Sequence, residues 1–204
     1  MTQTVTALYD TYDSAVAAVN ALEASGFPHS EISIVSNNVD NRYAKDRPTN
    51  AGADAGAGAG IGAVVGGVGG LLTGLGLMAI PGVGPVVAAG WLVATAAGAA
   101  TGAVVGGAAG GLVGSLTGAN VPERDAHLYA EGVRRGGTLV TARVDDARAS
   151  TAREILQRYK PVDPTARGAA YRESGWTSFD DNAPVYTAEQ IAAERARYVG
   201  RGSI

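Results

Sequence analysis

The chain has 204 residues, a net charge of −3, no cysteine, and 30 glycines. Its 8 prolines are too few for collagen, and its apolar share of 46% argues against disorder. A pI of about 5.4 argues against a basic nucleic-acid binder. The absence of cysteine excludes disulfides, a thiolate nucleophile and a cysteine-ligated metal.

The glycines are concentrated in the middle of the chain. Of the 30, 22 lie between Gly52 and Gly118, and residues 55–122 form a run of 68 without a charged side chain. This change in composition divides the chain into four parts. They are a discontinuous domain (1–38 and 121–160), a polar linker (39–55), a glycine-rich segment (56–119) and a C-terminal arm (161–204).

Residues 1–38 predict a strand, a helix and a second strand. Alternating apolar residues mark the strands, at Val5, Ala7 and Tyr9 and then at Ile32 and Ile34. The helix between them has a cap at Thr11 or Asp13 and ends at Gly26. Its apolar stripe consists of Ala15, Ala18, Val19 and Leu22.

The glycine-rich segment has glycines at every fourth position in two runs. The runs are Gly58, Gly62, Gly66, Gly70 and Gly74, and then Gly98, Gly102, Gly106, Gly110, Gly114 and Gly118. This spacing places glycines on one face of a helix, where two backbones can approach closely. Between the runs lies a turn formed by Pro81, Gly82, Gly84 and Pro85. The pattern predicts an antiparallel α-helical hairpin, a pair of glycine zippers.

Such a hairpin needs an environment that compensates its glycines, because each costs about 0.8–1 kcal/mol relative to alanine in a helix. The first arm, residues 56–80, would span roughly 37 Å and could cross a bilayer. Basic residues beyond both outer ends, such as Arg47 and Arg124, would place those ends on the cytoplasmic side. A soluble homo-oligomer with the hairpins as its dry core fits the same pattern. Either way the chain is its own partner, and the bilayer is a second partner in the first interpretation.

Residues 121–160 predict a helix, a strand and a helix. The first helix starts at Pro122, and its buried stripe consists of Ala126, Tyr129, Ala130 and Val133. The strand presents Thr138, Val140, Ala142 and Val144 on one face. Asp145 or Asp146 then caps the last helix. Together with residues 1–38, these elements favour a ferredoxin-like α+β domain, a small sheet with helices on one side.

The C-terminal arm contains aromatic residues spaced through polar ones, at Trp176, Phe179 and Tyr186. Thr187 and Gln190 form a capping-box pattern ahead of a short amphipathic helix that includes Ile191. Two interpretations remain: these apolar residues fasten the arm to its own domain, or they grip a neighbouring subunit.

No catalytic motif is found in the sequence. A Gly-x-Gly-x-x-Gly fingerprint, a Walker loop, Gly-x-Ser-x-Gly and His-Glu-x-x-His are all missing. His127 has Glu123 and Glu131 one turn away on either side, a pattern more typical of a solvated helix face than of a metal site. We therefore expect a non-enzyme with no cofactor, metal, nucleic acid or small-molecule substrate.

Two stretches resemble the general stress protein 17M-like domain family: TALYDTYDSAVAAVNALEASGFPHSEISIVS near the start and YAEGVRRGGTLVTARVDDARASTAREIL after the glycine-rich segment. The resemblance implies a bacterial, stress-associated protein and supplies no active-site residues. Our leading hypothesis is a structural protein that self-assembles through its glycine zippers in or on the cytoplasmic membrane, with its polar domains inside. The alternatives are a soluble cytoplasmic assembly and a regulatory module that senses a small ligand.

Overall fold

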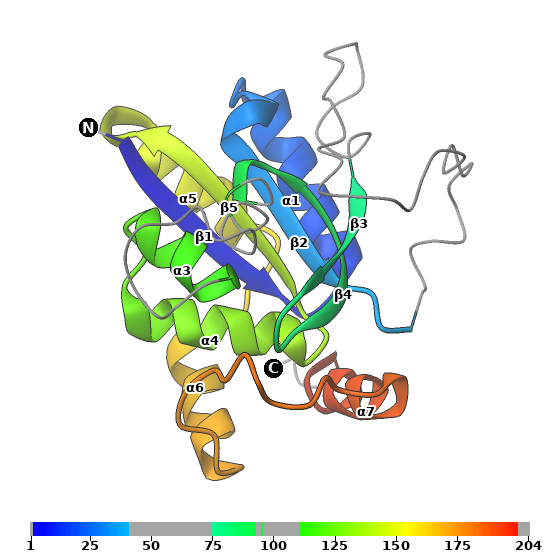
Figure 1. Ribbon diagram of the computed structural model, residues 1–204. Helices are drawn as coiled ribbons and strands as arrows, with labels where there is room; N and C mark the ends of the chain where they lie inside the picture. Colours follow the sequence, from blue (N-terminus) through cyan, green and yellow to red (C-terminus); the bar gives the residue numbers. More distant parts are fainter. Residues whose placement is uncertain (1, 41–74, 93–94, 96–110, 200–204) are drawn as a thin grey trace, which may run out of the picture.

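The computed structural model describes residues 2–40, 75–92, 95 and 111–199 of the chain (Figure 1). The described elements, in chain order, are β1 (Thr2–Tyr9), α1 (Tyr12–Ala24), η1 (His29–Glu31), β2 (Ile32–Asn37), β3 (Gly76–Ile80), β4 (Gly84–Gly90), α3 (Gly111–Gly118), α4 (Glu123–Arg134), β5 (Thr138–Asp145), η3 (Asp146–Arg148), α5 (Ala149–Gln157), α6 (Pro164–Glu173) and α7 (Ala188–Val199).

The five strands form one sheet in the order β1-β5-β2-β4-β3, and every neighbouring pair is antiparallel. Strand β5 lies between β1 and β2, so that Tyr9 pairs with Thr138 and Ile32 with Ala142. The two stretches on either side of the glycine-rich segment therefore share a single sheet. Each contributes strands that the other needs for its hydrogen bonds.

The expected helical hairpin is wrong on both sides of its turn, because residues 76–80 and 84–90 are strands. They form a β-hairpin whose second strand pairs with β2, from Ser33–Gly90 to Asn37–Val86. Pro81, Gly82, Gly84 and Pro85 do mark a turn, but it joins strands. Gly82 and Gly84 have φ of 71° and 94°, values that suit glycine and do not occur in a helix. The open edge of β2 satisfies the backbone of this segment, so pairing between distant residues outweighs the local glycine pattern.

Helices cover both faces of the sheet, which corrects the expectation of helices on one side and differs from the ferredoxin-like arrangement. Figure 1 shows α3 and α4 in front of the sheet and α1 and α5 behind it. Alternate residues of the central strands supply the two cores. Ile34 and Val140 pack toward α1 and α5, whereas Val35 and Leu139 pack toward α3 and α4. Strands buried on both faces are typical of a sheet between two helical layers.

The helix predictions for the globular parts are largely confirmed. Helix α1 has Thr11 as its N-cap, whose side chain accepts a hydrogen bond from the Ser14 N–H at 3.3 Å. Helix α4 begins directly after Pro122. The expected cap of α5 is wrong: neither Asp145 nor Asp146 caps the helix, and the 3-10 turn η3 comes first. Asp146 instead accepts a hydrogen bond from the Gln3 side chain at 2.8 Å.

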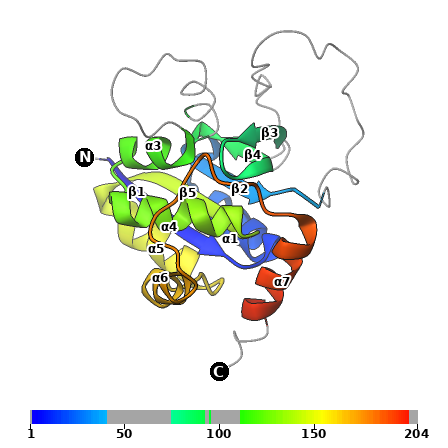
Figure 2. The same ribbon diagram turned by 60° about the horizontal axis from the view of Figure 1, so that its bottom comes forward.

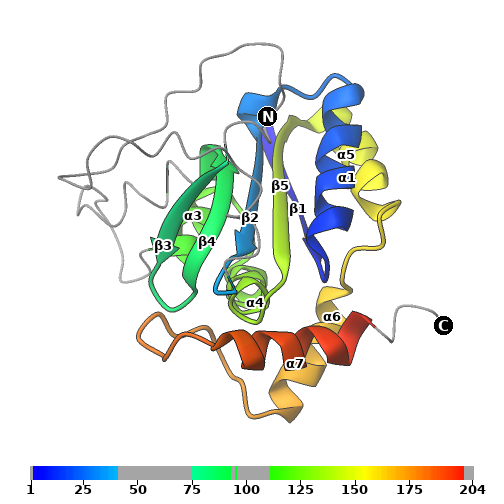
Figure 3. The same cartoon turned by 90° about the vertical axis from the view of Figure 1, so that its right-hand side faces the viewer.

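The C-terminal arm contains two helices, α6 and α7, at one end of the domain next to α4 (Figures 2 and 3). The capping box of α7 is confirmed, since Thr187 N–H donates to Gln190 Oε1 at 2.9 Å and Gln190 N–H to Thr187 Oγ1 at 3.3 Å. Helix α6 was not predicted. Its signal was present, because Asp163 caps the helix and Pro164 occupies its first turn.

Candidate functional site

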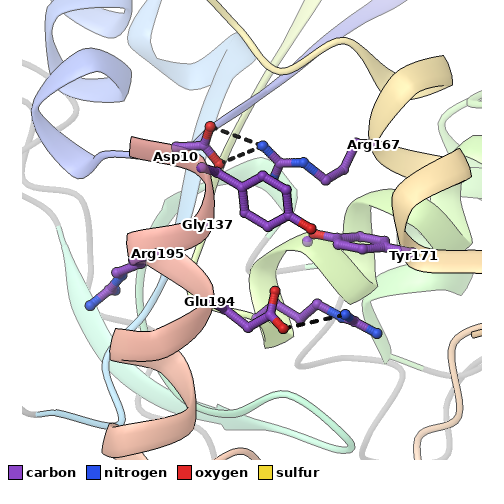
Figure 4. Close-up of a pocket in the computed structure, with 9 residues that line it drawn as sticks. Asp10, Gly137, Arg167, Tyr171, Glu194 and Arg195 are labelled. Atoms are coloured by element: carbon purple, nitrogen blue, oxygen red, sulfur yellow. Dashed lines mark hydrogen bonds and ion pairs between the residues drawn. The ribbon is translucent and has the colours of Figure 1, made fainter. Parts of the chain in front are cut away.

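A small recess lies where the end of β1, the C-terminal end of α4, and helices α6 and α7 meet (Figure 4). Its lining consists of Asp10, Gly132, Arg135, Gly137, Arg167, Tyr171, Glu194, Arg195 and Tyr198. The cavity has a volume of about 10 Å³, roughly the space that one water molecule needs. Sites for small organic ligands usually have roughly 300–1,000 Å³. The recess is thus too small for a metabolite, and its interest lies in the charged side chains around it.

The charged side chains beside the recess form a network of ion pairs. At its centre is the fully buried carboxylate of Glu131 on α4. Its Oε1 accepts a hydrogen bond from Arg135 Nε at 2.6 Å, and its Oε2 accepts one from Arg134 Nη1 at 3.2 Å. Arg135 also lies 3.7 Å from Glu194 Oε1 on α7. Burial alone would lower the pKa of Arg135, but the hydrogen bond and charge of Glu131 outweigh it and raise that pKa. Arg135 therefore stays charged and links α4 to α7.

A second ion pair connects α6 to the end of β1. Arg167 Nη2 donates to both carboxylate oxygens of Asp10, at 2.8 and 2.9 Å, as the dashed lines in Figure 4 show. The guanidinium of Arg167 also lies over the ring of Tyr198, 3.6 Å from its centroid. Since Tyr198 belongs to α7, one arginine of α6 fastens both helices of the arm to the domain.

Tyr171 of α6 lies between the two arginines of this network. Arg135 stacks over its ring, 4.2 Å from the centroid, and only 1% of the residue is exposed. Burial raises the pKa of Tyr171 well above its usual value, against the opposing charges of Arg167 and Arg135. The phenol is thus neutral at physiological pH. Tyr171 acts as an apolar and aromatic contact for the guanidinium groups.

Helix α7 docks on the two glycines that follow α4. Arg195 Nε donates to the Gly136 carbonyl at 3.0 Å, and its Nη1 donates to Asp40 at 2.8 Å. Gly136 has φ of 100°, and a Cβ there would lie 2.6 Å from Ile191 Cγ2. A Cβ on Gly137 would lie 2.9 Å from the Gly132 carbonyl oxygen. Both glycines are needed for the sharp turn into β5, and Gly136 also leaves room for α7.

The chemistry of this site is that of an intramolecular clamp. Each arginine of the lining has a carboxylate partner, in Glu131, Asp10 or Asp40. In the described residues no cluster of three or more His, Cys, Asp or Glu side chains is placed to hold a metal. The recess lining contains no histidine, serine or lysine that could act as a base or nucleophile. Its arrangement favours holding α6 and α7 in place.

The structure places three of the four predicted arm residues, Phe179, Tyr186 and Ile191, against the chain's own domain. The fourth, Trp176, packs within the arm, edge-on against Tyr171, with ring centroids 5.8 Å apart. Phe179 packs against the core on the α3 and α4 side, and Tyr186 lies 4.9 Å below the Arg134 guanidinium. Ile191 is fully buried. These three contacts join the arm to the domain of the same chain.

His127 also differs from its expected role on a solvated face. Its Nδ1 accepts a hydrogen bond from the Phe179 backbone N–H at 3.2 Å, and its Nε2 lies 3.9 Å from Glu123. His127 is thus another attachment point for the loop between α6 and α7.

Most of the predicted packing glycines lie outside the described residues. These are Gly58, Gly62, Gly66, Gly70, Gly74, Gly98, Gly102, Gly106 and Gly110. Gly114 and Gly118 lie in α3, which is helical as expected. A Cβ on Gly118 would have nothing within 4 Å, so this glycine makes no close backbone contact in the described structure.

The turn residues have a role that the sequence did not suggest, because the turn contacts the C-terminal arm. A Cβ on Gly82 would lie 2.6 Å from Asp181 Cα and 2.8 Å from the Asp180 carbonyl oxygen. A Cβ on Gly84 would overlap the Val185 side chain. The β3–β4 turn and the arm therefore pack directly against each other, and glycine permits that approach.

Fold and site together define a mixed α/β domain whose C-terminal helices are clamped to it by buried ion pairs. Residues 4–83 match the family model of the heat induced stress protein YflT domain. This part of the chain is therefore similar to a stress-protein domain, which is consistent with the resemblance to the general stress proteins. The match runs from β1 to the β3–β4 turn and ends before the second resembling stretch, at residues 129–156. No curated protein and no solved structure shows a significant match to the chain.

Proposed function

We propose that this protein is a stress-associated structural protein that acts without catalysis, by associating with copies of itself through its glycine-rich segments. These two segments, which contain the runs Gly58 to Gly74 and Gly98 to Gly110, flank the β3–β4 hairpin in the sequence. In this proposal the α/β domain is the folded scaffold, and the glycine-rich segments provide the contacts between copies.

The observation that carries the proposal is the position of the hairpin in the sheet. Gly76 pairs with Ala88, so the chain enters β3 and leaves β4 at the same end of the sheet. The end of the first glycine-rich segment and the start of the second therefore attach to the domain side by side. Such an arrangement presents both segments together to a second molecule.

The composition of the segments supports contact with other backbones. Nine of the eleven regularly spaced glycines lie in them, and no charged side chain occurs from residue 55 to residue 122. Glycine and alanine have no side chain or a small one, so stretches rich in them permit close approach between backbones. Such stretches gain little free energy from burying their own side chains. Association with identical segments of another copy is the simplest way to provide these close backbone contacts.

The fold argues against the membrane-crossing form of this hypothesis. Within the described residues, none of the helices combines the length and hydropathy needed to span a bilayer. Both glycine-rich segments start and end in the same folded domain, so a helical crossing would have to return. Two crossings require about 40 apolar residues, more than the 34 residues from 41 to 74 contain. We therefore favour assembly between copies, with binding to a membrane surface as the competing outcome.

The ligand-sensing alternative has less support. The recess beside α4 is small, and its arginines already have partners within the chain.

Sedimentation velocity of the purified protein tests the proposal. We expect the wild type to sediment as species larger than the 20.4 kDa chain, and the Gly66→Leu/Gly106→Leu variant to shift toward the monomer. Gly118→Leu is the matched control, since this exposed position has space for a side chain and the variant should keep the wild-type size.

A wild type that is monomeric at every concentration, or a double variant of unchanged size, contradicts assembly through these segments. Flotation with vesicles of zwitterionic and anionic phospholipids separates the competing outcome. If the protein is monomeric in solution and floats with the vesicles, binding to a membrane surface replaces self-assembly.

A further inference from the structure

Strand β3 forms one outer edge of the sheet, and the described residues give it none of the usual protection of an edge strand. Its sequence, Gly-Leu-Met-Ala-Ile, contains no charge and no proline, and its pairing with β4 runs without a bulge from Gly76–Ala88 to Ile80–Gly84. Leu77 is 62% exposed. Proteins normally blunt such edges with charges, prolines, bulges or a covering segment, because an open edge pairs with other strands.

The opposite edge of the same sheet, β1, shows what protection looks like. The Leu8 carbonyl accepts a hydrogen bond from the Val162 N–H at 2.7 Å, so the chain after α5 covers the end of this strand. Polar residues occupy the exposed start of β1, where the Gln3 side chain is bonded to Asp146. Among the described residues, β3 has no equivalent covering contact on its outer side.

The register shows which backbone groups of β3 point outward. The Pro85 carbonyl accepts a hydrogen bond from the Asn38 N–H at 2.8 Å, so Pro85 directs its backbone toward β2. Its partner Ala79 must then direct its own N–H and C=O away from β4, and Leu77, two residues earlier, does the same. These two residues therefore offer donors and acceptors along the open edge.

We propose that β3 pairs with β3 of a second copy of this chain, in an antiparallel register centred on Met78. In this register Leu77 of one copy and Ala79 of the other exchange N–H···O=C bonds, and the twofold axis repeats the exchange. Pro81, which has no N–H, follows directly after β3 and ends the ladder. The two sheets become one continuous sheet across the dimer.

A second copy is the occupant that best fits this edge. Isologous twofold pairing brings identical surfaces together, which requires a strand that neither repels itself nor needs a complementary charge. The uncharged β3 meets this condition, and its two outward-facing residues are self-complementary about Met78. The first glycine-rich segment runs directly into β3, so the edge is continuous with the contact surface of the proposed function. The inference rests on self-association as the function and assigns it an interface within the described residues.

The absence of cysteine from the chain allows a direct test of the register. Residues opposite each other in a non-hydrogen-bonded pair have Cα atoms about 4.5 Å apart, within the range for a disulfide. Met78→Cys should therefore form a disulfide dimer under mild oxidation. In Leu77→Cys the two cysteines are diagonal neighbours, with Cα atoms roughly 7–8 Å apart. This distance exceeds the range for a disulfide, so the variant should react at least about tenfold more slowly.

Gln3→Cys, at the exposed start of the opposite edge, measures random collision. Equal rates for Met78→Cys and Gln3→Cys would overturn the proposal. A faster reaction at Leu77→Cys than at Met78→Cys would overturn the register.

Ala79→Pro provides the disrupting variant. It removes an outward-facing N–H and no bond to β4, so the monomer should keep its wild-type melting temperature while the dimer signal in sedimentation velocity is lost. If Ala79→Pro retains both the fold and the wild-type oligomer size, the edge is not the interface.

The two self-association proposals fail separately. If Ala79→Pro dissociates the protein while Gly66→Leu/Gly106→Leu does not, the edge interface stands and the glycine-rich contact fails. The reverse result removes the edge interface and leaves the glycine-rich contact.

Discussion

The two sides of the sheet are held together by different means. On the side of α1 and α5 the core is almost wholly apolar, and its notable polar contact is the Tyr9 hydroxyl, which donates to the Leu156 carbonyl at 2.9 Å. On the side of α4, the apolar core gives way at one end to buried charges, with Glu131 fully buried and Arg135 only 9% exposed. Apolar packing tolerates graded change, whereas a buried ion network depends on every partner. We therefore expect substitutions on the two sides to differ in severity.

The largest effect is expected from Glu131→Ala, which leaves Arg134 and Arg135 without their shared buried carboxylate. Breaking a buried ion pair on one side costs about 3–5 kcal/mol, since the remaining charge stays desolvated. Urea denaturation should show a loss of this size in the free energy of unfolding. The exposed Glu154→Ala is the matched control and should change stability by less than about 0.5 kcal/mol. A loss below about 1 kcal/mol for Glu131→Ala would mean that the network is screened by solvent.

An intermediate effect is expected at alkaline pH through Tyr129 on α4. Burial, together with the negative charge of Asp125, raises the pKa of Tyr129 from 10.0 to about 12 in the folded protein. The unfolded chain therefore releases this proton first as the pH rises. Below about pH 10 the contribution of Tyr129 is constant, and from there to about pH 12 stability should fall by up to about 1.4 kcal/mol per pH unit.

Urea denaturation between pH 8 and 11 measures this slope. Tyr129→Phe should lower it relative to the wild type, and Tyr9→Phe provides the comparison from the α1 side, because burial also raises the pKa of Tyr9. An unchanged slope in Tyr129→Phe would contradict burial of its neutral phenol.

The smallest effect is expected from Thr11→Ala at the start of α1. The substitution removes the side-chain acceptor for the Ser14 N–H and should lower the free energy of unfolding by about 1 kcal/mol. Thr11→Ser keeps the cap and should remain within about 0.5 kcal/mol of the wild type. If both substitutions lower stability equally, the methyl group of Thr11, rather than its cap, stabilises this end of the helix.

Local patterns predicted those elements whose side chains mark their own period. Helix α1, with its cap and apolar stripe, and helix α7, with its capping box, follow from residues near one another in the chain. Strand β5 was equally visible, because Val140, Ala142 and Val144 alternate and lie together in one core. These predictions need no knowledge of distant residues.

The β3–β4 hairpin and the clamp were missed for a common reason. The hairpin residues 76–80 and 84–90 show no alternation of polar and apolar side chains. They form a pair of strands only because β2, about 50 residues away at the Ser36–Val87 pair, offers an open edge. Glu131 and Arg135 have the spacing of an ordinary surface ion pair. Helices α6 and α7 pack against this end of α4, and no pattern within α4 predicts that contact.

The central position of β5 determines when this protein can fold during its synthesis. Strands β1 and β2 do not pair with each other, and the strand that joins them is made about 100 residues after β2 ends. At the usual rate of about 5–20 residues per second, the ribosome needs roughly 5–20 s to reach it. The glycine-rich stretch is synthesised within that interval, before a finished sheet exists beside it. Nascent chains on one polysome thus carry this stretch before their domains are complete, which is when it is most open to other chains.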